Sequence, residues 1–272
     1  MRALLPLTTA LCLALAPMAP AQSAVDIYEK AAAAYKAGDL DTAFAGYLVA
    51  AHAGLDLAQY NVATYFRDGL GSVPAEGAKA EHWFKLAAAQ GNAMAAESLA
   101  MMYHYGNHIP QDATAARRYM QQAAEGGRVV AQYNFGVFLR HGMGGPTDLQ
   151  GAVPWLEKAA AADYTDAWLV LGDLHFNDLK DYASGYRYYE EAAKRDQPRG
   201  YHILGQMFFY GEGKPQDDIR AWVWFAFADG NGQPKARGFL DQLQARMTKS
   251  DFDAANALAD QCFESGEYTP CL

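Results

Sequence analysis

Residues 58–232 carry a hydrophobic pattern that repeats about every 36 positions and predicts pairs of α-helices. In the first helix of each pair, an apolar residue lies four positions after the helix start. In most units a bulky residue lies eight positions after the same start. These positions share one face, because an α-helix turns once in about 3.6 residues. A small residue directly follows the apolar residue and lets a neighbouring helix approach closely. The five predicted starts lie near Ala58, Ala95, Ala131, Ala167 and Gly200.

The segments between the helices carry a second periodic signal. Glycine follows most first helices and is expected to end them by accepting a positive φ, as at Gly69, Gly106, Gly142 and Gly211. A proline and then an acidic residue come next, and the acidic side chain suits the free N–H groups at the start of a helix. The second helix carries an aromatic residue at Trp83, Tyr119, Trp155, Tyr188 and Trp224, followed in most units by an Ala-Ala pair. Because four residue classes keep the same phase, the repeat is genuine.

Two places depart from this pattern. The unit at 167–197 has neither glycine nor proline in its inter-helix loop, from Asn177 to Asp181. Pro154 falls inside a predicted second helix, where proline has no N–H to donate. We expect a local kink or a shifted helix start at both places.

The two ends of the repeat array are also predicted to be helical. Residues 26–54 resemble a further helix pair with a tight Gly38-Asp39 turn. Two apolar stripes follow Pro234: Phe239, Leu240, Leu243 and Met247, then Phe252, Ala255, Leu258 and Cys262. Thr248 with Asp251 is typical of a capping box between them. Such helices would cover the open end of a repeat core.

The whole pattern resembles Sel1-like repeats, relatives of the tetratricopeptide class, most clearly over residues 204–217. The resemblance covers most of the chain. It implies an all-α fold, a right-handed α-solenoid of stacked antiparallel helix pairs with C-terminal capping helices. We expect residues 1–21 to be a signal peptide and 22–56 a repeat-like helix pair. Residues 57–232 would form the five-unit Sel1-like solenoid, and 233–272 the capping helices and a disulfide-closed tail.

The N-terminal segment has the features of a secretory signal peptide. Arg2 precedes an apolar stretch from Ala3 to Ala16, and Ala19 and Ala21 supply the small residues expected before a cleavage site at Gln22. The alternative is a buried N-terminal helix. The apolar stretch is too short to span a bilayer, and no later stretch is long enough, so we expect no stable membrane insertion. The sequence thus predicts a periplasmic or secreted protein.

Charge and cysteine content narrow the possible partners. Loss of Arg2, the only charge in the segment, takes the formal net charge from −9 to −10. Such an acidic chain is not expected to bind nucleic acid or an anionic membrane surface. Cys262 and Cys271 remain after cleavage, and in an oxidising compartment they are expected to form a disulfide worth about 2–3 kcal/mol. They do not form a C-x-x-C redox pair, and no histidine close in sequence suggests zinc.

Catalytic and metal-binding motifs are absent from the sequence. It contains no G-x-S-x-G, S-x-x-K, H-E-x-x-H or P-loop pattern. Gly69-Leu70-Gly71 and its copies recur at the repeat period, which favours a helix end over a phosphate-binding loop. His104 and His108 are four residues apart, but Gly106 lies between them and no third ligand is evident. We therefore expect no enzymatic activity, no cofactor and no metal.

The candidate binding residues come from an analogy with tetratricopeptide grooves, in which set positions of each first helix face the concave side. These positions are Tyr60, Glu97, Tyr133, Arg67, His104, Arg140, Phe176, Phe209, His141 and Tyr210. The strip would be cationic and aromatic in its first half and aromatic-apolar in its second. It would suit an extended peptide or short helix with an acidic group towards the N-terminal repeats. The alternative is that these side chains only pack between neighbouring repeats.

The resemblance also bears on function. Exported Sel1-like proteins include negative regulators of sensor kinases and assembly factors for exopolysaccharide export. This implies a non-enzymatic protein–protein interaction scaffold or regulator in the cell envelope, with a protein or peptide in its concave groove. Two alternatives stay open: an exported cell-wall-directed hydrolase whose site carries no motif, and a secreted effector that binds a host protein.

Overall fold

The computed structural model describes residues 23–265 and Cys271, so the expected signal peptide lies outside the described residues. Six helix pairs follow one another along the chain, and a C-terminal pair completes it. The pairs are α1 (Ala24–Lys36) and α2 (Leu40–His52), α3 (Asp56–Asp68) and α4 (Gly77–Ala89), α5 (Ala93–Tyr105) and α6 (Ala113–Glu125), α7 (Val129–His141) and α8 (Leu149–Ala161), α9 (Asp166–Asp173) and α10 (Tyr182–Ala193), α11 (Pro198–Tyr210) and α12 (Asp218–Gly230), and finally α13 (Ala236–Arg246) and α14 (Lys249–Ser265). Within the described residues there is no β-strand.

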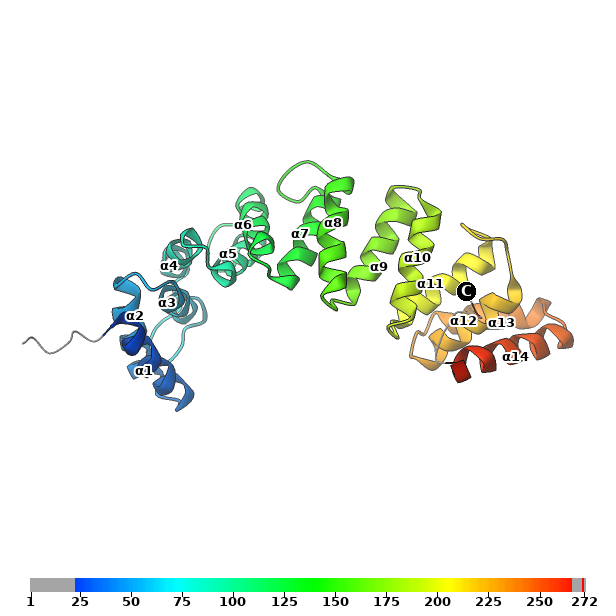
Figure 1. Ribbon diagram of the computed structural model, residues 1–272, viewed down its shortest axis with the longest axis horizontal. Coiled ribbons are helices and arrows are strands. Elements are labelled where there is room, and N and C mark those ends of the chain that lie inside the picture. The colour runs from blue at the N-terminus through cyan, green and yellow to red at the C-terminus, as the bar shows by residue number, and fades with distance from the viewer. Residues whose placement is uncertain (1–22, 266–270, 272) are drawn as a thin grey trace, which may run out of the picture.

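The pairs stack into an α-solenoid, as the sequence predicts. From α1 to α13 each helix packs against the next one along the chain, and α14 packs against α12. Figure 1 shows the pairs following one another in an arch, with α4 and α6 towards the outer side and α3 and α5 towards the inner side. The first helices of these two units therefore lie towards the concave face.

Helix ends follow the predicted local chemistry. The first helices α3, α5, α7 and α11 each end at a glycine in the left-handed region, with φ of 67, 70, 66 and 72°. The second helices α6, α8, α10 and α12 each begin at an aspartate whose carboxylate accepts the N–H three residues on. Glu76 before α4 is the exception and makes no side-chain cap bond. In the second, third and fifth pairs of the repeat array both helix ends are therefore set by local residues.

The small residues of the first helices allow the close packing that the pattern predicts. A Cβ added to Gly172 would lie 2.4 Å from the Tyr189 ring, and one added to Gly136 would lie 2.6 Å from Leu156. The buried side chains form two hydrophobic clusters, one from Ala31 to Leu174 and the other from Leu169 to Cys271. The clusters overlap only in the fourth of the five predicted units, around α9.

The long inter-helix loops rest on the preceding unit. In the loop after α3, Ser72 donates its backbone N–H and its hydroxyl to the Asp41 carboxylate at the start of α2, at 2.8 and 2.9 Å. Gly144, in the loop after α7, lies against Ala113 at the start of α6, because a Cβ there would be 2.0 Å from the Ala113 carbonyl oxygen. These loops therefore tie consecutive units together along one edge of the solenoid.

The fourth unit is irregular, as its sequence predicts. Its first helix α9 continues as a π-helical turn, η1 (Leu174–Asp178), and only residues 179–181 join this turn to α10. Lys180 takes a φ of 59°, a value that glycine would adopt more easily. Pro154 behaves differently: α8 begins at the Asp148 cap, as in the other units, and runs through the proline. The helix start is therefore not shifted there.

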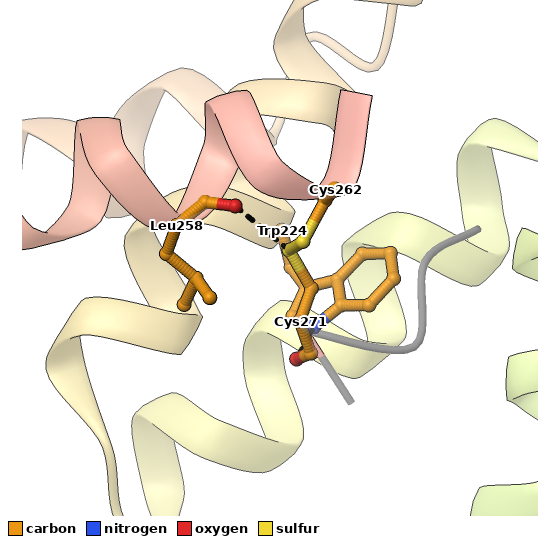
Figure 2. The surroundings of a disulfide bond; sticks show 4 residues. All are labelled: Trp224, Leu258, Cys262 and Cys271. Carbon is orange, nitrogen blue, oxygen red and sulfur yellow. Dashed lines mark hydrogen bonds between the residues drawn. A yellow bond between two sulfur atoms is a disulfide. The ribbon is translucent and has the colours of Figure 1, made fainter. Parts of the chain in front are cut away.

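The C-terminal pair closes the end of the core. Thr248 and Asp251 form the predicted capping box, with their backbone N–H groups bonded to each other's side chains at 2.8 and 3.3 Å. Leu240, Leu243 and Ala255 are buried, whereas Met247 follows α13 rather than lying within it. Cys262 of α14 and Cys271 form the expected disulfide, and the Trp224 indole N–H donates to the Cys271 carbonyl oxygen at 3.0 Å. Figure 2 shows this disulfide beside the Trp224 ring.

A Cys271→Ser variant is expected to be less stable than the native chain by about 2–3 kcal/mol, because the short loop closed by the disulfide becomes unconstrained when unfolded. Urea unfolding followed by circular dichroism measures the loss. A reductant should destabilise the native chain by a similar amount and leave the variant unchanged. A native chain whose unfolding midpoint ignores the reductant would contradict the expectation.

Candidate functional site

The concave face is the part of the molecule where a partner could meet several repeats at once. Among the described residues, no group of three or more His, Cys, Asp or Glu side chains is placed to hold a metal. No helix in the same part of the chain is both long and apolar enough to cross a bilayer.

In the first half of the predicted strip, charged side chains pair with one another. Arg67 donates to the neighbouring Asp68 through two nitrogens, each at 2.7 Å, and this bond raises the pKa of Arg67 and lowers that of Asp68. Glu97 forms an ion pair with Arg128 at 2.7 Å. Tyr60 is half-buried against Phe84. The cation expected to attract a ligand at Arg67 is thus already neutralised.

The middle of the strip shows the same pairing. Arg140 reaches Asp178 of η1 at 2.5 Å, and only 12% of its side chain is exposed. Tyr133 packs against Tyr164 with ring centroids 4.7 Å apart, and burial raises its pKa. His104 lies against Phe138, whereas His141 is exposed at the end of α7. In this region His141 is the predicted residue most open to a partner.

The second half of the strip divides into core and surface. Phe209 is only 8% exposed, because Phe225 and Phe239 pack around it. It is therefore a core residue and not part of an exposed binding surface. Phe176 lies between Tyr182 and Tyr189. Tyr210 is 56% exposed. The ten predicted residues therefore do not form one continuous exposed strip.

A cleft opens between the fourth unit, the fifth unit and the segment that precedes α13. It has a volume of about 650 Å³, and its walls come from α9, η1 and α11 and from residues 233–235 before α13. A second hollow of about 390 Å³ shares Phe176, Asn177 and Glu212 with it. The two hollows therefore form one groove. Its lining mixes charged residues with the apolar side chains of Phe176, Ile203 and Met207.

Asp173, one of the residues that line the cleft, is held by two hydrogen bonds. The Asp173 carboxylate accepts the Tyr189 hydroxyl at 2.9 Å and the Arg199 guanidinium at 2.7 Å. Burial, followed by the charge and hydrogen bond of Asp173, raises the pKa of Tyr189. Arg199 is 53% exposed, so part of its guanidinium still faces solvent. A guanidinium has five N–H donors in a planar fork, which leaves Arg199 donors for a ligand.

A histidine and a lysine, His202 and Lys235, also line the cleft. The His202 ring packs against Phe225 and Phe239, at centroid distances of 5.5 and 5.6 Å. Burial lowers the pKa of His202, and the nearby Lys235 charge lowers it further, which favours the neutral ring. The cleft therefore joins a neutral imidazole to two cations, Arg199 and Lys235.

Comparison with known proteins places this architecture. The model of the family described as Sel1 repeat matches residues 56–92, 93–127, 129–164, 169–197 and 198–228, which together make up more than half of the chain. The chain belongs to the Sel1 repeat family. Proteins with these repeats generally mediate protein–protein interactions and are typically non-enzymatic scaffolds. The matched segments include the irregular fourth unit.

Solved structures agree on the fold of this Sel1 repeat protein. A Sel1 repeat protein from Oxalobacter formigenes is 24% identical, with a TM-score of 0.64 over 85% of this chain and 96% of that one. The protective antigen c5321 of uropathogenic Escherichia coli, which displays the same repeat fold, is 24% identical with a TM-score of 0.63. That match covers 91% of this chain and 55% of the antigen. No curated protein matches the chain.

Phe176 is a predicted residue that lines the cleft of this Sel1 repeat protein, whereas Arg199 and Lys235 were missed in the sequence. The tetratricopeptide analogy assigns the same surface positions to every unit, and neither Arg199 nor Lys235 occupies one of them. The available signal was the missing glycine and proline of the fourth unit, which marked a place where the repeat geometry changes. The cleft lies beside that unit.

A His202→Gln variant tests the environment of this histidine. The folded-state pKa of His202 is lowered, so the unfolded chain binds the proton more tightly than the folded chain does. The contribution of His202 to folding stability therefore falls as the pH drops below 6.5. Urea unfolding at about pH 5 and at about pH 7.5 should therefore show a smaller pH dependence in the variant than in the native chain. Equal pH dependence in both would contradict the expectation.

Proposed function

We propose that this Sel1 repeat protein is a non-enzymatic interaction scaffold or regulator of the cell envelope that binds a protein or peptide on its concave face. The observation that carries the proposal is the groove beside α11, which draws its walls from two repeat units and from residues 233–235 before α13. A groove of this kind suits a chain segment that contacts several units together. The family's general role in protein–protein interaction supports the same choice.

Two observations support a periplasmic or secreted location. The first 21 residues have the charge, apolar stretch and small residues of a signal peptide. The Cys262–Cys271 disulfide suits an oxidising compartment, because cytosolic thiols are usually kept reduced. A location in the envelope would also restrict the partners to other exported proteins.

Site-specific photo-cross-linking in the native host tests the proposal. A photoreactive residue is placed at Tyr105 or Tyr210, which are exposed on first helices, or at Leu86 or Gln121, which are exposed on second helices. The concave positions should cross-link to a defined exported protein, and the outer positions should not. Cross-links from the outer positions alone, or turnover of a purified cell-wall fragment with no partner, would overturn the proposal.

A further inference from the structure

The groove is long enough for a short chain segment. Its lining follows α11 from Arg199 at the start of the helix to Glu212 just after its end. Thirteen residue steps along a helix correspond to roughly 20 Å. An extended chain covers that length with about six residues. The groove therefore has the dimensions of a hexapeptide.

The positive end of the groove lies at the start of α11. Arg199 and Lys235 both line the cleft there, and His202 beside them is favoured in its neutral form. Within residues 23–265 and Cys271, the Lys235 ammonium makes no hydrogen bond or ion pair. Arg199 keeps donors free beyond its bond to Asp173. Both Asp173 oxygens already accept a bond, so that carboxylate is committed to Tyr189 and Arg199.

The arginines selected by the sequence pattern offer less to an acidic ligand. Arg67 and Arg140 are each held by a carboxylate of the same chain, Asp68 and Asp178. A ligand carboxylate would have to displace these partners, whereas at Lys235 it would displace only water. The position for an acidic group thus moves from the N-terminal repeats to the C-terminal end of the solenoid.

We propose that this groove binds an extended protein segment that ends in, or carries near its end, a carboxylate. The carboxylate lies between Arg199 and Lys235, and an apolar side chain packs against Phe176 and Met207. The inference rests on the proposed scaffold function and names the chemistry of the partner segment. Guanidinium and ammonium groups together favour a carboxylate, and the apolar middle of the groove adds the contact area that orients the segment.

Fluorescence anisotropy with labelled hexapeptides tests the proposal. All peptides carry an N-terminal fluorophore on Ser-Leu-Ala-Leu-Ser and differ at the sixth residue: Asp with a terminal amide, Asn with a free carboxylate, or Asn with a terminal amide. At least one of the two peptides with a single carboxylate should bind the native protein about tenfold more tightly than the uncharged peptide. The comparison between those two peptides distinguishes a side-chain carboxylate from a chain terminus.

Three variants identify the binding position. Lys235→Glu should remove the advantage of the acidic peptide, Glu212→Gln within the same groove should keep it, and Lys30→Glu on α1 should also keep it. The last variant makes the same charge change at the far end of the solenoid. Equal affinity of all three peptides for the native protein, or equal losses in Lys235→Glu and Lys30→Glu, would overturn the inference. Concave cross-links that persist in Lys235→Glu would then show that the scaffold function stands without it.

Discussion

A Trp224→Ala variant is expected to lose about 3–5 kcal/mol of unfolding free energy. Trp224 is fully buried in α12, its ring stacks on Tyr201 at 6.0 Å, and its indole N–H donates to the Cys271 carbonyl oxygen. The substitution leaves a cavity and also removes the hydrogen bond to the Cys271 carbonyl oxygen. Urea unfolding followed by circular dichroism measures the loss.

Trp83→Ala is the matched control, since Trp83 occupies the equivalent repeat position in α4 but remains partly exposed. We expect its loss to be clearly smaller, because less apolar surface returns to water and a smaller cavity forms. Equal losses in the two variants would contradict the expectation that the deeper burial of Trp224 and its hydrogen bond to Cys271 add stability.

A Gly144→Ala variant is expected to lose about 2–5 kcal/mol. Gly144 has a φ of 71°, which disfavours any side chain, and its Cβ would lie 2.0 Å from the Ala113 carbonyl oxygen. The added Cβ would meet the backbone of α6 and not a flexible side chain, so the clash can be relieved only by shifting the loop or the helix. Urea unfolding provides the measurement.

Gly127→Ala separates the two contributions in this prediction. Gly127 has a φ of 82° with no atom within 4 Å of an added Cβ, so the variant carries the conformational cost alone, about 1–2 kcal/mol. The difference between the two losses of unfolding free energy measures the cost of moving the loop away from the preceding unit. If Gly144→Ala proved no worse than Gly127→Ala, the loop contact would contribute little.

The repeat architecture could be predicted because its determinants are local and recur. Glycine at Gly69 or Gly211 ends a helix by its own conformational freedom, and Asp112 or Asp217 starts the next one through its own carboxylate. Neither residue needs a distant partner to act. Repetition then multiplies a weak signal into a strong one.

The surface could be predicted only in part, because its chemistry depends on distant residues. Arg140 is neutralised by Asp178, 38 positions away, and Phe209 is buried by Phe239 of the C-terminal pair. No spacing within one repeat reveals either contact. The tetratricopeptide analogy treats each unit as interchangeable, whereas the fourth unit and the chain end break that equivalence and shape the cleft.

The three-residue connection in the fourth unit has a mechanical consequence. The long loops of the neighbouring units pack against the unit before them, whereas the connection at 179–181 has only three residues. It lies where the two hydrophobic clusters meet. Cooperativity in a solenoid is transmitted only between neighbours. The chain is therefore expected to unfold as two blocks, with Trp224 and the disulfide in the C-terminal block and the groove at the joint between the blocks. Stress applied along the arch would concentrate at that joint.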